Sequence, residues 1–334
     1  MKKIYIITRK ITVFLLLMLL IIELFACSKK VENNTEVKSN KSAKYKVITT
    51  IFPYYDIVKN IIKNTENIEV DFLLDTGVDL HSYNPTAQDL TDIAESDLFI
   101  FTGGESEDWI ELARKTIKPE KTKFINLMEI LPDILIEEDE DEHDHKEEEH
   151  EHEFDEHIWL SLVNAGAIIK TINNALCELD IDNKEKYNEN THKYLEEFDK
   201  VDQNLKKVLG LKEKKYIVFA DRFPFKYMFD DYKIDYLAAF SGCSAESEAS
   251  FNVIAKLSRA IDAHNLNSVL ILEGNNKKIA EAVIKNSEAW IKKREIKIYN
   301  MDSLQSITRN DLKHNVSYLD IMKGNADTLI KALD

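Results

Sequence analysis

The feature that most constrains the fold is the alternation of short β-prone runs with amphipathic segments of helical period. Strand candidates rich in Ile, Val, Phe and Leu fall at residues 45–51, 70–74, 98–101, 123–127, 216–220, 269–272 and 296–299. Apolar residues recur at helical spacing in segments such as 54–63, 86–95, 250–264 and 277–292. This alternation predicts an α/β fold with mainly parallel sheets.

A single long helix is expected to separate two α/β halves. Residues 184–209 carry no strand pattern, and their apolar side chains, from Tyr187 to Leu209, recur at helical spacing before Gly210. The pattern predicts one helix of roughly seven turns. We therefore expect two lobes joined by one long backbone helix. Their predicted bounds are 45–183 for the N-terminal lobe, 184–210 for the connecting helix and 211–334 for the C-terminal lobe.

The first 44 residues predict an export signal followed by a tether. Basic residues precede an apolar run at 11–26, whose length of roughly 16 residues is short for a membrane span. The run ends in LFAC at 24–27, which resembles a bacterial lipobox in which Cys27 is acylated. An ordinary signal peptide is the alternative. Residues 28–44 are polar and predict a flexible tether. The mature chain is thus expected to be a monomer, held by lipid on the extracytoplasmic face of a bacterial cell membrane.

The net charge argues against one class of partner, and the cysteines leave the disulfide state open. A formal net charge of −16 argues against nucleic acid, because phosphate binding requires basic patches. Cys177 and Cys243 could form one disulfide or could be two separate buried thiols, and the sequence leaves both open.

Residues 137–153 combine dense carboxylates with four imidazoles, those of His143, His145, His150 and His152. The segment has almost no apolar side chain, so we expect a surface loop that forms no core. Imidazoles among carboxylates favour borderline transition metals, zinc above all. The alternative is a solvating acidic insert with incidental histidines.

Two further histidines lie where the fold would hold them. His81 stands in GVDLHSYNP at 77–85, after a strand candidate and before a helix, where ligands bind in parallel sheets. His157 stands in DEHIWL at 155–160, directly before an apolar triplet. Considered alone, His81 could equally be a loop histidine bonded to the backbone, and a single histidine in the place of His157 is more often structural.

The chain resembles a known family at this point. The residues that carry the resemblance are TTIFPYYDIV at 49–58, the 77–85 loop, DLFI at 97–100, Trp109 and DEHIWL at 155–160. Together they look like the metal-binding receptors of zinc and manganese ABC importers, over essentially the whole mature chain. The resemblance implies two α/β lobes joined by one helix and a metal in the cleft between them. It also implies His81 and His157 as ligands and an ABC permease as partner.

The chain departs from the zinc-type pattern in its second half. The stretch VFADRFPFKY at 218–227 lacks the histidine that zinc-type relatives have there. Asp221 could ligate instead, although Arg222 could equally pair with it. Asp302 matches the carboxylate of manganese-type relatives. Other candidate ligands are Glu246, Glu248 and Glu273, of which Glu273 could also accept a hydrogen bond from a ligand histidine or cap a helix.

Several functions remain open from the sequence. Two histidines with carboxylates suit Zn²⁺, with Mn²⁺ or iron as alternatives. A metal-dependent hydrolase with Asp221 as base is a second reading, and a surface adhesin or metal buffer is a third. The sequence contains no HExxH pairing, no nucleophile elbow and no phosphate loop. We therefore expect a binding protein and no enzyme.

Overall fold

The computed structural model describes residues 43–117, 121–138, 154–242, 248–274 and 276–334. Several positions singled out above lie outside these ranges: Cys27, His143, His145, His150, His152, Cys243 and Glu246. Among the described residues, no helix combines the length and the apolar composition that crossing a bilayer would require.

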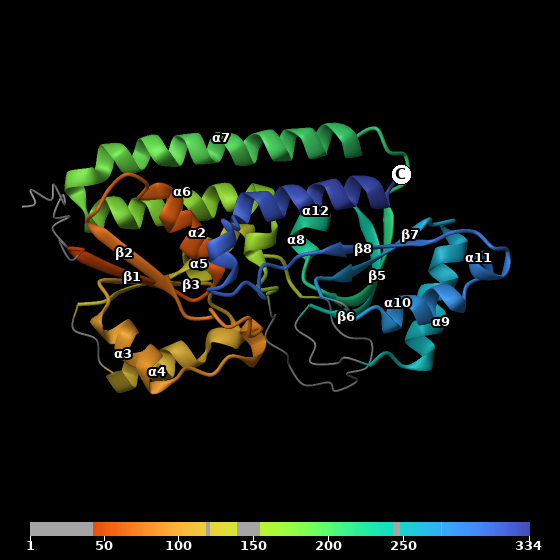
Figure 1. The fold of residues 1–334 in the computed structure, drawn as a ribbon, viewed down its shortest axis with the longest axis horizontal. Coiled ribbons are helices and arrows are strands. Elements are labelled where there is room, and N and C mark those ends of the chain that lie inside the picture. Colours follow the sequence, from red (N-terminus) through yellow and green to blue (C-terminus); the bar gives the residue numbers. More distant parts are fainter. Residues whose placement is uncertain (1–42, 118–120, 139–153, 243–247, 275) are drawn as a thin grey trace, which may run out of the picture. The chain divides into compact units, whose positions relative to one another are not determined.

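Two four-stranded parallel sheets form the scaffold (Figure 1). The first contains β1 (Tyr45–Thr49), β2 (Ile68–Phe72), β3 (Leu98–Phe101) and β4 (Lys123–Asn126) in the order β2-β1-β3-β4. The second contains β5 (Tyr216–Phe223), β6 (Asp235–Ser241), β7 (Ser268–Leu272) and β8 (Lys297–Met301) in the order β6-β5-β7-β8. The two sheets therefore share one topology, in which the winding direction reverses beside the first strand. Ligands bind at such reversal points, outside the carboxyl ends of the strands.

The inner strands are buried on both faces, as parallel strands covered by helices should be. Every residue of β3 and of β7 is buried. The predicted α/β fold of two lobes with parallel sheets is confirmed. One strand was missed, since β6 lies at a sheet edge and most of its residues are only half-buried. Its sequence, DYLAAFS, lacks the continuous apolar run that reveals an inner strand.

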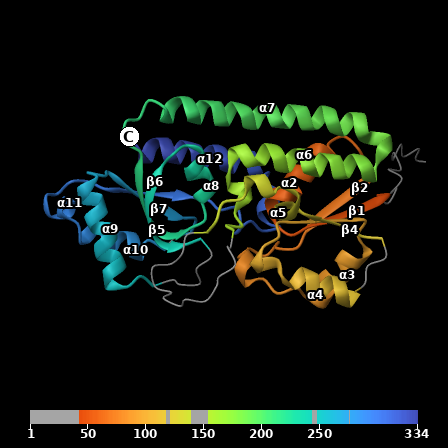
Figure 2. The ribbon, with the colours of Figure 1, turned by 180° about the vertical axis from the view of Figure 1, so that it is seen from behind.

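Helices flank both sheets (Figures 1 and 2). In the first half they are α2 (Phe52–Ile61), α3 (Ala87–Glu95), α4 (Trp109–Ile117), α5 (Leu127–Ile130) and α6 (Leu162–Leu179). In the second half they are α8 (Lys226–Asp231), α9 (Phe251–Ala263), α10 (Lys278–Lys285), α11 (Glu288–Ile291) and α12 (Tyr318–Ala332). The single amphipathic segment expected at 277–292 is wrong in one respect, because it forms two helices. The Ser287 side chain accepts a hydrogen bond from the Trp290 N–H and so begins α11 as a separate helix.

The long helix is α7 (Lys184–Leu209), as the periodicity predicted. Its buried face includes Tyr187, Tyr194, Phe198 and Leu205, and it packs against α2, α6 and α12 (Figure 1). Because α12 follows the second sheet while α2 and α6 belong to the first half, α7 contacts helices from both halves. The largest hydrophobic cluster likewise includes residues of both sheets.

A buried carboxylate joins three of these helices. Asp56 Oδ2, on α2, accepts hydrogen bonds from the Tyr194 hydroxyl of α7 at 2.8 Å and the Tyr318 N–H of α12 at 3.3 Å. The Asn60 amide donates to the same oxygen at 3.1 Å. Burial raises the pKa of Asp56 to about 6. This polar contact fixes the register of α12 against the first half of the chain.

Candidate metal centre

His81 lies on a short, strongly fixed loop that follows β2. It is the central residue of the 3₁₀ helix η1 (Leu80–Ser82), whose N-cap Asp79 accepts the His81 N–H at 3.0 Å through Oδ1. Gly77 begins the loop with φ at +75°, and a Cβ there would stand 3.0 Å from the Ser306 carbonyl oxygen. Only glycine meets both conditions without strain. The loop is thereby held against a segment that follows β8.

His157 is fully buried and precedes the 3₁₀ helix η4 (Ile158–Leu160), whose three residues are also buried. Asp155 Oδ1 accepts the His157 backbone N–H at 2.8 Å and lies 3.1 Å from the ring Nδ1. The carboxylate therefore favours the proton on Nδ1 and leaves Nε2 with a free lone pair.

The two imidazoles face one another. His81 Nε2 and His157 Nε2 are 3.4 Å apart, with ring centroids at 5.3 Å and an interplanar angle of 49°. That separation is long for a hydrogen bond between nitrogens. Two nitrogens bound to zinc at about 2.05 Å with a tetrahedral angle of about 109° stand roughly 3.3 Å apart. The pair is held at the spacing that one tetrahedral metal ion requires.

The surroundings shift the pKa values of the two rings in opposite directions. Burial and the neighbouring His157 hold the pKa of His81 well below its usual value. Burial also disfavours the charged form of His157, but the charge and hydrogen bond of Asp155 outweigh it and raise the pKa of His157. At neutral pH the His81 ring is therefore uncharged and able to ligate a metal.

The second half of the chain contacts both histidine loops. Gly242 follows β6, and a Cβ there would stand 3.1 Å from His157 Cε1. Arg222, in β5, donates from Nη1 to Asp79 Oδ2 at 3.0 Å. The Trp159 ring N–H donates to the Ser303 carbonyl, after β8, at 3.0 Å. The histidine pair therefore lies between the two lobes, at the carboxyl ends of the strands.

A crossing segment at 303–309 fastens the His81 loop to the second lobe. The buried Gln305 side chain accepts the Leu80 N–H at 3.1 Å, next to His81. Thr308 forms an antiparallel bridge with Thr76, and the Arg309 guanidinium binds the carboxylates of Asp71 and Asp75.

The carboxylates expected to complete the site have other partners in this structure. Asp221 Oδ1 accepts the Arg222 backbone N–H at 2.9 Å, and Asp302 Oδ1 accepts the Leu304 N–H at 2.8 Å. Burial, followed by the charge of Glu273, raises the pKa of Asp302 to about 6. Within the described ranges, no three histidine, cysteine, aspartate or glutamate side chains gather closely enough to hold a metal. The histidines are brought together, and the two aspartates are not brought to them.

Two expectations about neighbouring residues are corrected. The Arg222 guanidinium pairs with Asp79, because β5 directs it towards the other lobe, and so it does not occupy Asp221. Glu273 contacts neither histidine and caps no helix. Its carboxylate accepts the Ser303 N–H at 2.9 Å and the Ser303 hydroxyl at 2.5 Å, which anchors the segment after β8. Glu248 is exposed.

Sequence reasoning missed the aspartates that hold the histidines, although a signal was present. Asp79 and Asp155 each stand two residues before one of the paired histidines and accept its backbone N–H, at 3.0 and 2.8 Å. The Asp-x-His spacing is present at both loops, but it also occurs at 141–143 and 262–264, so it is a signal only together with the loop position. Cys177 is buried with a free thiol that contacts Asn173.

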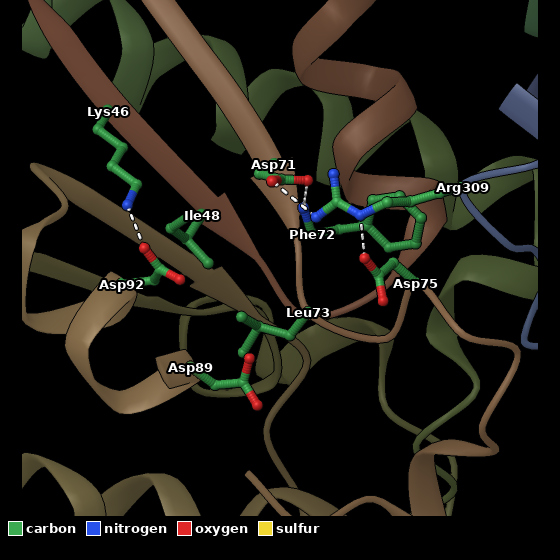
Figure 3. A pocket seen from close by; sticks show the side chains of 9 residues that line it. All are labelled: Lys46, Ile48, Asp71, Phe72, Leu73, Asp75, Asp89, Asp92 and Arg309. Atoms are coloured by element: carbon green, nitrogen blue, oxygen red, sulfur yellow. Dashed lines mark hydrogen bonds and ion pairs between the residues drawn. The ribbon is translucent and has the colours of Figure 1, made fainter. Parts of the chain in front are cut away.

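A separate cavity of about 90 Å³ lies beside β1 and β2 (Figure 3). Its charged groups are largely paired, with Lys46 bound to Asp92 and Arg309 bound to Asp71 and Asp75. None of its lining residues is a histidine. The cavity is an ion-paired surface depression and does not belong to the histidine pair.

Two lobes of parallel sheet, one long helix and a pair of imidazoles at metal spacing between the lobes define the class of two-lobed metal-binding receptors. The family model described as "Zinc-uptake complex component A periplasmic" matches residues 47–332, and the chain belongs to this family. The family comprises the substrate-binding components of zinc ABC uptake systems, which are transport proteins and not enzymes.

Individual relatives agree with this assignment. The chain is 30% identical over 296 residues to the high-affinity zinc uptake system protein ZnuA of Bacillus subtilis, covering 88% of this chain and 89% of that protein. It is 28% identical to the zinc-binding lipoprotein AdcA of Streptococcus pneumoniae but spans only 56% of its length.

Solved structures show the same fold. The metal-dependent lipoprotein YcdH of Bacillus subtilis superposes with a TM-score of 0.69 at 26% identity, covering 86% of this chain and 99% of that one. Zn(II)-bound AdcA of Streptococcus pneumoniae superposes with a TM-score of 0.68 at 26% identity, covering 87% of this chain and 58% of that one.

Proposed function

We propose that this chain is an extracytoplasmic receptor that binds one Zn²⁺ between His81 and His157 and delivers it to an ABC permease. The observation that carries the proposal is the 3.4 Å separation of the two Nε2 atoms. Zinc at this position would be bound by neutral imidazoles whose orientation is set by the fold. As transported cargo, the ion must also be released, which suits a site formed where two lobes meet.

Asp221 and Asp302 complete the site in this proposal. Each lies beside a residue that contacts a histidine loop, since Arg222 binds Asp79 and the Ser303 carbonyl accepts from Trp159. A closure of the lobes around the ion would have to bring these carboxylates to it. Two nitrogen and two oxygen ligands suit zinc and also accept manganese, so the ratio of the two affinities must be measured.

The His-rich segment, with His143, His145, His150 and His152, collects metal for this site. The residues that flank this segment pair with each other just ahead of His157. Glu137 forms a β-bridge with Phe154, and the Asp155 N–H donates to the Ile136 carbonyl at 2.9 Å. Residues 139–153 can therefore be deleted and replaced by a short linker without altering the position of His157.

Metal binding by the chain and three variants tests the proposal. The variants are deletion of 139–153, His81→Ala with His157→Ala, and His192→Ala as a matched control on the exposed face of α7. Titration with Zn²⁺ against a chelator of known affinity should show one tight site in the parent chain, the deletion and the control. The double alanine should lose it. Tight binding that survives the double alanine overturns the site, and tight binding lost only with the deletion identifies a metal buffer.

Membrane attachment is proposed through acylated Cys27. Expression in a bacterial host with labelled fatty acid should label the parent chain and leave Cys27→Ala unlabelled. Release of the parent chain into the medium without label would favour an ordinary signal peptide.

A further inference from the structure

The tripeptide Asp155-Glu156-His157 presents two adjacent carboxylates to two different imidazoles. Asp155 Oδ1 lies 3.1 Å from Nδ1 of His157. Glu156 is directed to the other ring, with Oε2 at 3.9 Å from Nδ1 of His81. One short segment therefore contains His157 and also places a carboxylate near Nδ1 of both His157 and His81.

Ser106 lies between Glu156 and His81. Its hydroxyl oxygen is 2.5 Å from His81 Nδ1, and its backbone N–H donates to Glu156 Oε1 at 2.8 Å. Ser106 therefore contacts the His81 ring through its hydroxyl and the Glu156 carboxylate through its backbone N–H.

Burying the Glu156 side chain costs free energy. The residue is only 3% exposed, and its Oε2 atom has no hydrogen-bond partner among the described residues. A buried carboxylate oxygen left unpaired is unfavourable, and such groups in native proteins call for an explanation. Gly104, with φ at +87°, provides the space, because a Cβ there would stand 2.5 Å from Glu156 Oε1.

We propose that Glu156, acting through Ser106, is the positioning residue that keeps the proton of His81 on Nδ1. The His81 Nδ1–H then donates to Ser106 Oγ, and the Ser106 hydroxyl donates to the carboxylate. Nε2 of His81 is left with its lone pair directed at the metal position and at His157. A carboxylate behind a ligand histidine fixes its tautomer and orientation in this way. The inference rests on the proposed function, since it concerns the same ligand.

A purely structural role for Glu156 makes a different prediction. If its carboxylate only anchored the turn at Gly104 and Ser106, replacing it would alter stability and leave the His81 tautomer unchanged. The tautomer therefore separates the two roles.

Glu156→Gln is the informative variant. Its carbonyl can keep the hydrogen bond from the Ser106 N–H, and its NH₂ group then faces the Ser106 hydroxyl. The hydroxyl would accept that N–H and donate its own proton to His81 Nδ1, which moves the ring proton to Nε2. Glu107→Gln is the matched control, because Glu107 is equally buried and its Oε2 accepts the Gly103 N–H at 2.7 Å.

The experiment measures the His81 tautomer by long-range ¹H–¹⁵N NMR and the Zn²⁺ affinity of the same variants. We expect the Nδ1–H form in the parent and Glu107→Gln chains and the Nε2–H form in Glu156→Gln. Zinc affinity should fall roughly 10- to 100-fold with Glu156→Gln. Ser106→Ala, on a half-buried residue, should also weaken zinc and serves if Glu156→Gln fails to fold. An unchanged tautomer and affinity in either variant overturns the inference, whereas loss of the proposed function would show as no tight zinc site in the parent chain.

Discussion

Gly242→Ala tests whether the second lobe packs directly on His157, one of the two proposed metal ligands. The added Cβ would stand 3.1 Å from His157 Cε1, 3.3 Å from Nδ1 and 3.0 Å from the Phe223 carbonyl oxygen. Ordinary contacts begin near 3.4 Å. The backbone of β5 yields less readily than a ring, so the imidazole or the whole lobe must shift by about 0.3 Å.

This shift is large for a metal ligand. Metal–ligand distances hold to within about 0.2 Å, so His157 Nε2 would lie outside the range that suits the ion and His81 together. Removing the support of a ligand typically costs about 10- to 100-fold in metal affinity. We expect Gly242→Ala to weaken Zn²⁺ binding by about tenfold, or roughly 1.4 kcal/mol.

Competition with a fluorescent zinc chelator measures the change. Gly324→Ala is the control, because its Cβ would have no neighbour within 4 Å and the residue lies in α12, far from the pair in sequence. It should leave zinc affinity unchanged and should stabilise the helix by about 0.5–1 kcal/mol. Equal zinc affinity in Gly242→Ala and the parent chain would refute the close packing of Gly242 on His157.

Three other predictions concern the histidine pair, the buried carboxylate of Asp56 and the ion pair of Arg222 with Asp79. Zinc affinity should fall as the pH decreases, with one proton competing for each zinc ion, because His157 gains a proton while the lowered pKa of His81 keeps that ring neutral. A plot of log affinity against pH whose slope corresponds to two protons above about pH 6.5 would contradict this. The stability of Asp56→Asn relative to the parent chain should rise by up to ~3 kcal/mol between about pH 4 and about pH 7. The reason is that the pKa of Asp56 is about 6 in the folded chain, above its unfolded value, so the parent chain loses stability as the pH rises through that interval. Denaturant unfolding at the two pH values measures the difference, and a pH-independent effect would refute the assignment. Arg222→Met should speed zinc release by roughly threefold, since its bond to Asp79 is partly exposed, and the effect should vanish in high salt.

The agreement between sequence and fold was greatest where the sequence pattern is unbroken. The strand at 98–101 and the helix at 184–209 were predicted with the bounds that the structure gives, because the strand is a continuous apolar run and the helix keeps its helical periodicity throughout. β6 was missed because an edge strand buries one face and shows a weaker pattern. The break between α10 and α11 depends on one side-chain cap at Ser287, which helical periodicity alone does not reveal.

Periodicity and loop position are local properties of the chain, so they were enough to predict the class of fold and to single out the two histidines. The 3.4 Å approach of His81 Nε2 to His157 Nε2 could not be predicted in this way, since packing of two loops brings together residues 76 positions apart. The fold also brings Arg222 to Asp79 across the lobes and places Glu156 Oε2 3.9 Å from His81 Nδ1. Those partners are chosen by the direction of side chains in space, which spacing along the chain does not encode.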